Sequence, residues 1–138
     1  LKTNKKMGRV FFDTRKNVHN LTAAYQVLSS DSGKVFTIDQ DAAFAITLPA
    51  THLEGENYKF IVTDAGSGEV HITSGTSAGI KGFSMDPTTG INAISNVLVE
   101  IVASTAVIGD VVKLVSDGTT WWCESFSSAT NGIVGADS

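Results

Sequence analysis

Residues 110–124 constrain the fold of this chain more than any other stretch. Two runs of β-favouring residues flank the dipeptide Asp117-Gly118, which tolerates the positive φ angles of a type I′ turn. A two-residue loop fixes the strand register, so we expect Leu114 to oppose Trp121 and Lys113 to oppose Trp122. The other predicted pairs are Ser116–Thr119, Val115–Thr120, Val112–Cys123 and Val111–Glu124.

The two faces of this predicted hairpin differ in character, because alternate residues of a strand share a face. The predicted core face carries Val112, Leu114, Trp121 and Cys123, and the opposite face carries Val111, Lys113, Val115, Trp122 and Glu124. The second face is amphipathic, and tryptophan is enriched at binding hot spots, so Lys113 and Trp122 are our candidate interface residues. The alternative, that Trp122 fills the second side of a sandwich or barrel, stays open.

The rest of the chain also favours strands. Short alternating segments recur every 8–12 residues or so from residue 25 onward, with turn signals between them, and no amphipathic helix longer than about three turns is visible. A chain of 138 residues suits one domain. We therefore predict an all-β fold, a single antiparallel β-sandwich or barrel (jelly-roll-like) of about eight or nine short strands, with an extended N-terminal arm.

Charge is distributed unevenly along the chain. Residues 1–16 hold six basic residues and one acidic residue, a net charge of +5, whereas the remaining residues hold four basic and thirteen acidic ones, a net charge of −9. We expect residues 1–16 to form a basic arm, residues 17–126 the β-sandwich, and residues 127–138 a flexible C-terminal tail. The basic residues of the arm are Lys2, Lys5, Lys6, Arg9, Arg15 and Lys16.

Composition excludes several classes of protein. No apolar run is long enough to span a bilayer, and no signal-peptide pattern is present. A single cysteine rules out an internal disulfide, and its predicted place on the core face makes Cys123 a small hydrophobe rather than a reactive thiol.

Catalytic motifs are sparse. Residues 75–79 match the Gly-x-Ser-x-Gly string of a nucleophile elbow around Ser77, but that motif needs a following helix, and residues 80–84 do not have a helical pattern. His19, His52 and His71 lie in different predicted elements, so no histidine is placed near Ser77. The sequence predicts no catalytic group and no enzyme activity.

Metal-binding patterns are equally weak. His52, Glu54 and Glu56 alternate along an extended segment, which a solvated loop also explains. Asp39 and Asp41 lack the remaining ligands of a calcium loop. We expect neither a metal site nor a cofactor.

The basic arm suggests a partner. Clustered Lys and Arg could bind nucleic acid, but an acidic body would repel it and no aromatic residue interleaves the charges before Phe11. Docking onto an acidic protein surface fits better, and a plain solubilising tail is the other explanation.

The order of strands and turns resembles that of the small β-domains of tailed bacteriophages, found as head decoration (cement) proteins and in tail fibres. The resemblance is carried by residues 29–39, by Phe44-Ala-Ile-Thr-Leu-Pro49, by Tyr58-Lys-Phe-Ile-Val62 and by residues 109–122, where a Gly-Asp strand reaches a Ser-Asp-Gly-Thr turn followed by tryptophan. It covers roughly residues 25–125 and includes no invariant site.

The resemblance implies a protein that works by binding. Cement proteins are small β folds, often trimeric, that hold adjacent major capsid protein subunits on the capsid exterior. On this basis we expect a capsid decoration protein, a homo-oligomer with a trimer favoured, without membrane contact, and with residues 1–16 as its capsid-binding arm. The alternative is a tail-fibre or receptor-binding domain that recognises host glycan through Tyr25, Trp122 and loop carboxylates.

Overall fold

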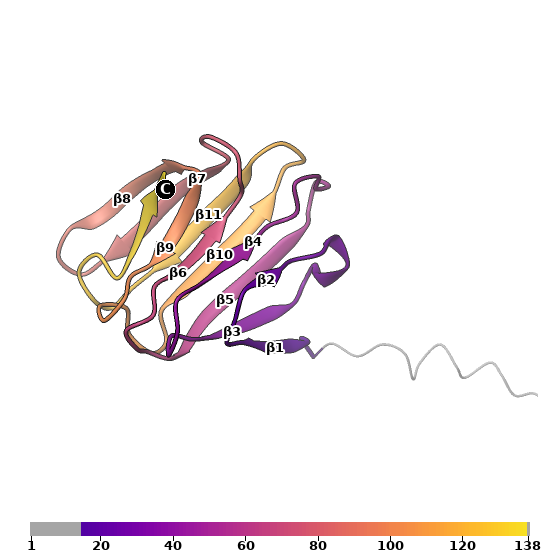
Figure 1. Cartoon of the computed structure of the whole chain (residues 1–138). Helices are drawn as coiled ribbons and strands as arrows, with labels where there is room; N and C mark the ends of the chain where they lie inside the picture. The colour runs from indigo at the N-terminus through magenta and orange to yellow at the C-terminus, as the bar shows by residue number, and fades with distance from the viewer. Residues whose placement is uncertain (1–14, 138) are drawn as a thin grey trace, which may run out of the picture.

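A computed structural model describes residues 15–137 of the chain, so the predicted arm lies outside the described residues except for Arg15 and Lys16. Two β-sheets pack face to face around one buried core, as Figure 1 shows. The predicted all-β sandwich is confirmed, and the described residues contain no α-helix. No helix in residues 15–137 has the length and apolar character needed to cross a membrane.

The larger sheet has seven strands in the order β1-β3-β5-β10-β11-β7-β8. Their bounds are β1 Val18–Leu21, β3 Val35–Asp39, β5 Asn57–Asp64, β7 Ile80–Asp86, β8 Gly90–Asn96, β10 Val111–Ser116 and β11 Trp121–Phe126.

The smaller sheet has five strands in the order β12-β9-β6-β4-β2 and lies in front of the larger one in Figure 1. Its bounds are β2 Tyr25–Gln26, β4 Phe44–Thr47, β6 Val70–Thr73, β9 Leu98–Ile101 and β12 Ile133–Ala136. A single 3-10 turn, Ser29–Asp31, connects β2 to β3.

The described residues form twelve strands, not eight or nine, and both sheets are mixed rather than purely antiparallel. From β1 to β7 the chain alternates between the two sheets, so strands that neighbour each other within a sheet are next-but-one in sequence. Such neighbours run in the same direction, as β1, β3 and β5 do in one sheet and β2, β4 and β6 in the other.

The core is apolar and rich in aromatic side chains. Phe36 and Phe60 lie stacked with ring centroids 5.2 Å apart, and Trp121, 1% exposed, contacts the Tyr58 ring at 5.5 Å. The imidazole of His52 stacks on the indole of Trp121, with the ring centroids 4.4 Å apart. Burial of each large apolar side chain stabilises the fold by about 1.5–3 kcal/mol.

The C-terminal segment is not the flexible tail that we predicted. Strand β12 pairs with β9 in an antiparallel ladder, and Ile133 at its start is 2% exposed within the core. The small residues of this segment allow the close packing: a Cβ added at Gly135 would lie 2.3 Å from Oδ1 of Asn96, a residue of β8.

Candidate functional site

The hairpin of β10 and β11 has the predicted faces but a different register. Leu114 opposes Cys123, and Val115 opposes Trp122, so the pairing is displaced by two residues from the prediction. The reason is the carboxylate of Asp117, which accepts hydrogen bonds from the backbone N–H groups of Thr119 at 2.9 Å and Thr120 at 2.7 Å. The turn is thereby centred one residue later, with Gly118 in its first central position at φ +93°.

A displacement of two residues leaves each side chain on its predicted face. Val112, Leu114, Trp121 and Cys123 are all less than 5% exposed, so the predicted core face is confirmed. Trp122 lies on the outer face of the larger sheet and is 45% exposed, so it does not fill a second core.

A hydrogen bond to Asp117 holds the indole of Trp122 in place. Its Nε1–H donates to Oδ2 of Asp117 at 2.8 Å. Hydrogen bonds from the backbone N–H of Thr120, from the Trp122 indole and from the backbone N–H of Thr119 lower the pKa of Asp117 to about 2. The carboxylate therefore remains ionised at neutral pH and fixes the orientation of a half-exposed aromatic ring.

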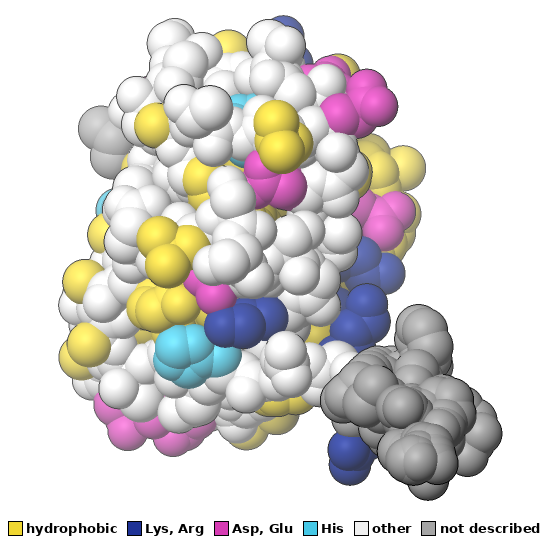
Figure 2. Space-filling view, turned by 90° about the vertical axis from the view of Figure 1, so that its right-hand side faces the viewer, with side chains coloured by type: hydrophobic (Ala, Val, Ile, Leu, Met, Phe, Trp, Pro, Cys, Tyr) yellow, Lys and Arg dark blue, Asp and Glu magenta, His cyan; other side chains and the backbone are white. Residues whose placement is uncertain are grey.

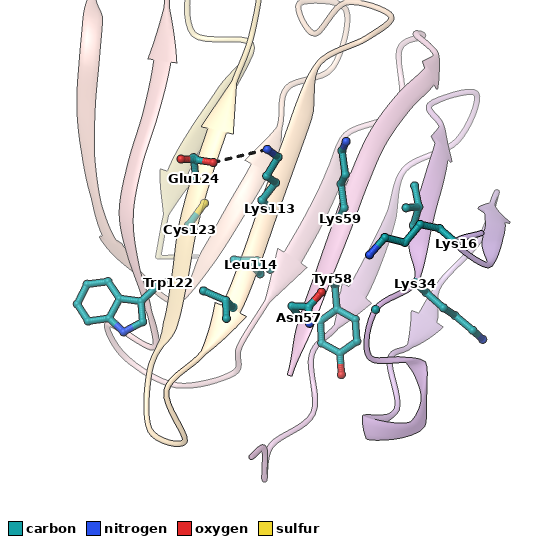
Figure 3. Close-up of a pocket in the computed structure, with 13 residues that line it drawn as sticks. Lys16, Lys34, Asn57, Tyr58, Lys59, Lys113, Leu114, Trp122, Cys123 and Glu124 are labelled. Carbon is teal, nitrogen blue, oxygen red and sulfur yellow. Dashed lines mark ion pairs between the residues drawn. The ribbon is translucent and has the colours of Figure 1, made fainter. Parts of the chain in front are cut away.

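A groove of about 420 Å³ runs across the outer face of the seven-stranded sheet beside this ring. Strands β3, β5, β10 and β11 form its floor, and Figure 3 shows the side chains that line it. The lining residues are Lys16, Gly33, Lys34, Val35, Asn57, Tyr58, Lys59, Lys113, Leu114, Val115, Trp122, Cys123 and Glu124.

The groove is basic. Lys59 on β5 lies directly opposite Lys113 on β10, and both side chains extend in the same direction in Figure 3. Lys113 pairs with Glu124 at 3.7 Å, whereas no ion pair joins Lys59 to another of the described residues. Lys34 pairs with Asp31 at 2.6 Å. Basic side chains accordingly gather along the right-hand margin of Figure 2, with acidic and hydrophobic ones above them.

An apolar row crosses the same face next to the groove. Successive cross-strand partners on β5, β10, β11, β7 and β8 place five apolar side chains side by side. Phe126 is 36% and Ile91 68% exposed in this row. The five residues, called the apolar row below, are Ile61, Val111, Phe126, Met85 and Ile91.

The predicted interface residues are brought together. Lys113 and Trp122 both line the groove, and so does Lys16, which belongs to the predicted arm. The last residue of the predicted arm and the outer face of the hairpin, which the sequence presents as two separate candidates, therefore line one groove. Lys2, Lys5, Lys6 and Arg9 lie outside the described residues, and Arg15 lies beside Lys16 near the 3-10 turn.

Sequence reasoning missed the contribution of β5. Lys59 alternates with the buried Tyr58 and Phe60, which is a visible signal that its side chain faces outward. Its position opposite Lys113, 54 residues later in the sequence, depends on the pairing of two distant strands, for which no local signal exists.

The catalytic pattern around Ser77 does not form a nucleophile elbow, because strand β7 follows it where a helix is required. A histidine does contact a serine elsewhere: Nδ1 of His52 hydrogen bonds to Oγ of Ser116. Ser116 is only 3% exposed and also accepts a hydrogen bond from the N–H of Gly118. The hydrogen bond between His52 and Ser116 therefore closes one end of the core.

The structure separates or regroups the residues of the weak metal-binding patterns in the sequence. Glu56 is 7% exposed and accepts hydrogen bonds from the Leu53 N–H and the Tyr58 hydroxyl, so it does not form a group with His52 and Glu54. Asp39 and Asp41 are joined by Asp64, while a second cluster consists of Glu69, His71 and Glu100.

Tyr25 does not lie in the groove. Its ring packs against His19 and Phe36, and its hydroxyl donates to Asp31 at 2.9 Å. No protein-family profile matches this chain, and no curated protein sequence shows significant similarity to it.

Proposed function

We propose that this protein is a tailed-bacteriophage capsid decoration (cement) protein that binds the exterior of the major capsid protein lattice through the outer face of its seven-stranded sheet. The observation that carries the proposal is the opposed pair Lys59 and Lys113 in a groove bordered by the half-exposed Trp122. The order of strands and turns, which resembles that of phage β-domains, supports the same function.

The charges of the groove favour an acidic partner. Like charges placed directly opposite each other in a sheet destabilise it, so the pair is costly unless a ligand supplies counter-charge. Carboxylates of an acidic protein surface would neutralise Lys59 without displacing Glu124 from Lys113.

The apolar row provides the second part of the surface. Interfaces combine apolar contact area with charged and polar groups at the margin, and aromatic residues are enriched in them. A face that offers Phe126, Ile91 and Trp122 next to clustered lysines has this composition.

The basic arm extends the same surface. Residues 1–16 carry a net charge of +5, and Lys16, the last of them, lines the groove. Such a segment would steer the protein toward an acidic capsid and add contacts after docking. A homotrimer, implied by the resemblance, belongs to this proposal, and sedimentation equilibrium of the purified protein tests it.

Quantification of the protein in purified virions of the encoding phage tests the function. A copy number comparable with that of the major capsid protein is expected, whereas absence from the virion would contradict the proposal.

Deletion of residues 1–16 should weaken co-sedimentation with capsids. Raising the salt concentration from about 0.05 to about 0.5 M should weaken co-sedimentation of the wild type as well, because the screening length shortens. Unchanged affinity after deletion would contradict the role of the arm.

A second candidate function is glycan recognition by a tail-fibre or receptor-binding domain. The observation that favours it is the indole of Trp122, held by Asp117 at the border of a groove that also presents Asn57 and Glu124. Trp121 is buried, so a saccharide that binds there should change the fluorescence of Trp122 selectively. No fluorescence response across a glycan panel, together with absence of the protein from purified tails, would exclude this function.

A further inference from the structure

The outer face of the five-stranded sheet, on the side opposite the groove, carries one compact group of ionisable residues. His71 on β6 lies directly opposite Glu100 on β9, and Glu69 precedes β6 on the same side as His71. The flanking positions in this cross-strand row are Ala45 on β4 and Val134 on β12, both without ionisable groups.

The three side chains converge on one point. Nε2 of His71 lies 3.0 Å from Oε1 of Glu69 and 3.3 Å from Oε2 of Glu100, and one ligand atom from each residue lies within 4.8 Å of the other two. In tetrahedral Zn²⁺ sites the metal–N and metal–O distances are about 2.0–2.2 Å, which places neighbouring ligand atoms roughly 3.3 Å apart. The two histidine–carboxylate distances therefore match the edges of a zinc coordination shell.

The charge of the group suits a dication. No lysine among the described residues pairs with either carboxylate, and both carboxylates contact the imidazole of His71. A bound metal ion would compensate both carboxylates.

The group is also held rigidly yet open to solvent. Two of the three residues occupy inner strands of the sheet, and the side chains of Glu69, His71 and Glu100 are 40%, 30% and 18% exposed. Rigid strands fix ligand positions better than loops, and the solvent side leaves room for a water molecule as a fourth ligand.

We propose that Glu69, His71 and Glu100 form a Zn²⁺ site with Nε2 of His71 and one carboxylate oxygen from each glutamate as ligands. The site goes beyond capsid binding and does not depend on it, because it lies on the opposite sheet.

Isothermal titration of chelator-treated, tag-free protein with ZnCl₂ tests this site, and Co²⁺ absorption reports its coordination. The wild type should bind one equivalent of Zn²⁺, and Co²⁺ should give the intense visible bands of a tetrahedral complex. His71→Ala and Glu100→Gln should each weaken binding at least about tenfold. His19→Gln, which removes a histidine of β1, should leave the affinity unchanged.

Circular dichroism and thermal unfolding of each variant show whether it is folded. Absence of wild-type binding, or equal Zn²⁺ affinity of the wild type and a folded His71→Ala variant, would overturn the proposal; the group would then be a histidine–carboxylate ion pair. Capsid co-sedimentation of His71→Ala should equal that of the wild type, so failure of the zinc site and failure of the capsid function are distinguishable.

Discussion

Lys59 and Lys113 occupy directly opposed positions on two neighbouring antiparallel strands, in the middle of the outer face of the larger sheet. Only one of the two lysines has a carboxylate partner among the described residues. A sheet that serves stability alone gains from opposite charges at such a position. The arrangement is therefore the strongest structural reason to regard this face as a binding surface.

Replacement of Lys59 by threonine should stabilise the protein. Removing the like-charge pair should raise the free energy of unfolding by about 0.2–1 kcal/mol, which urea denaturation at low salt can measure. Lys81→Thr is the matched control, since Lys81 is exposed on the same sheet face but opposes Trp122 and Ser95. An equal gain in both variants would mean that threonine's strand preference, not charge repulsion, is responsible.

Asp117 should make the protein sensitive to acid. Its pKa in the folded protein, about 2, lies below the ordinary value of 3.8, so the ionised carboxylate stabilises the fold above the ordinary pKa. This contribution is lost as the pH falls toward 2. The difference in Tm between the wild type and Asp117→Asn should therefore shrink between about pH 6 and about pH 2.

The same substitution should change the environment of Trp122, because the carboxylate accepts the indole N–H. Tryptophan fluorescence of Asp117→Asn at neutral pH should show this change. A Tm difference that is constant with pH would contradict the assigned ionisation of Asp117.

Gly82→Ala should destabilise the protein severely. Gly82 has a φ of +140°, and a Cβ at this position would lie 2.0 Å from the backbone oxygen of Cys123 on the parallel neighbour β11. We expect a loss of about 3 kcal/mol or more in the free energy of unfolding.

Gly118→Ala is the matched comparison for this prediction. Gly118 also has a positive φ, but the nearest atom to an added Cβ is 3.8 Å away, so only the backbone cost of about 1–2 kcal/mol is expected. If the Gly82 variant lost no more stability than the Gly118 variant, the parallel pairing of β7 with β11 would be wrong.

The thiol of Cys123 should be inert while the protein is folded. The side chain is 4% exposed, and burial raises the pKa of the thiol to about 12. A disulfide reagent at about pH 8 should label it only as fast as the protein unfolds, so labelling should accelerate with urea. Immediate labelling of the whole population without denaturant would contradict the assigned core face.

The hairpin shows how far sequence reasoning reaches. Alternation correctly predicts Leu114 and Trp121 in the core and Trp122 on the opposite face, because a two-residue period depends only on local geometry; the exposure of Trp122 is known only from the structure. The predicted register was wrong because the carboxylate of Asp117 accepts hydrogen bonds from the turn backbone and shifts the turn. The β propensities of the flanking residues do not reveal this shift.

The sheet order could not be predicted. An antiparallel arrangement is predicted from the sequence, yet β3 and β5 are parallel neighbours, and β4, which lies between them along the chain, belongs to the opposite sheet. The groove depends on this order, since it places Lys59 next to Lys113. The prediction of a flexible C-terminal tail was wrong for a related reason. Strand β12 is ordered by its pairing with β9, which is distant in sequence.

Quantitative co-sedimentation with capsids of the encoding phage tests the central claim most directly. The wild type should bind saturably, and Lys59→Thr/Lys113→Thr, which removes the opposed charges without altering the core, should lose most of this affinity. Lys81→Thr should retain it. No saturable binding by the wild type, or equal binding by the wild type and the double variant, would contradict the assignment of the seven-stranded face as the capsid-binding surface.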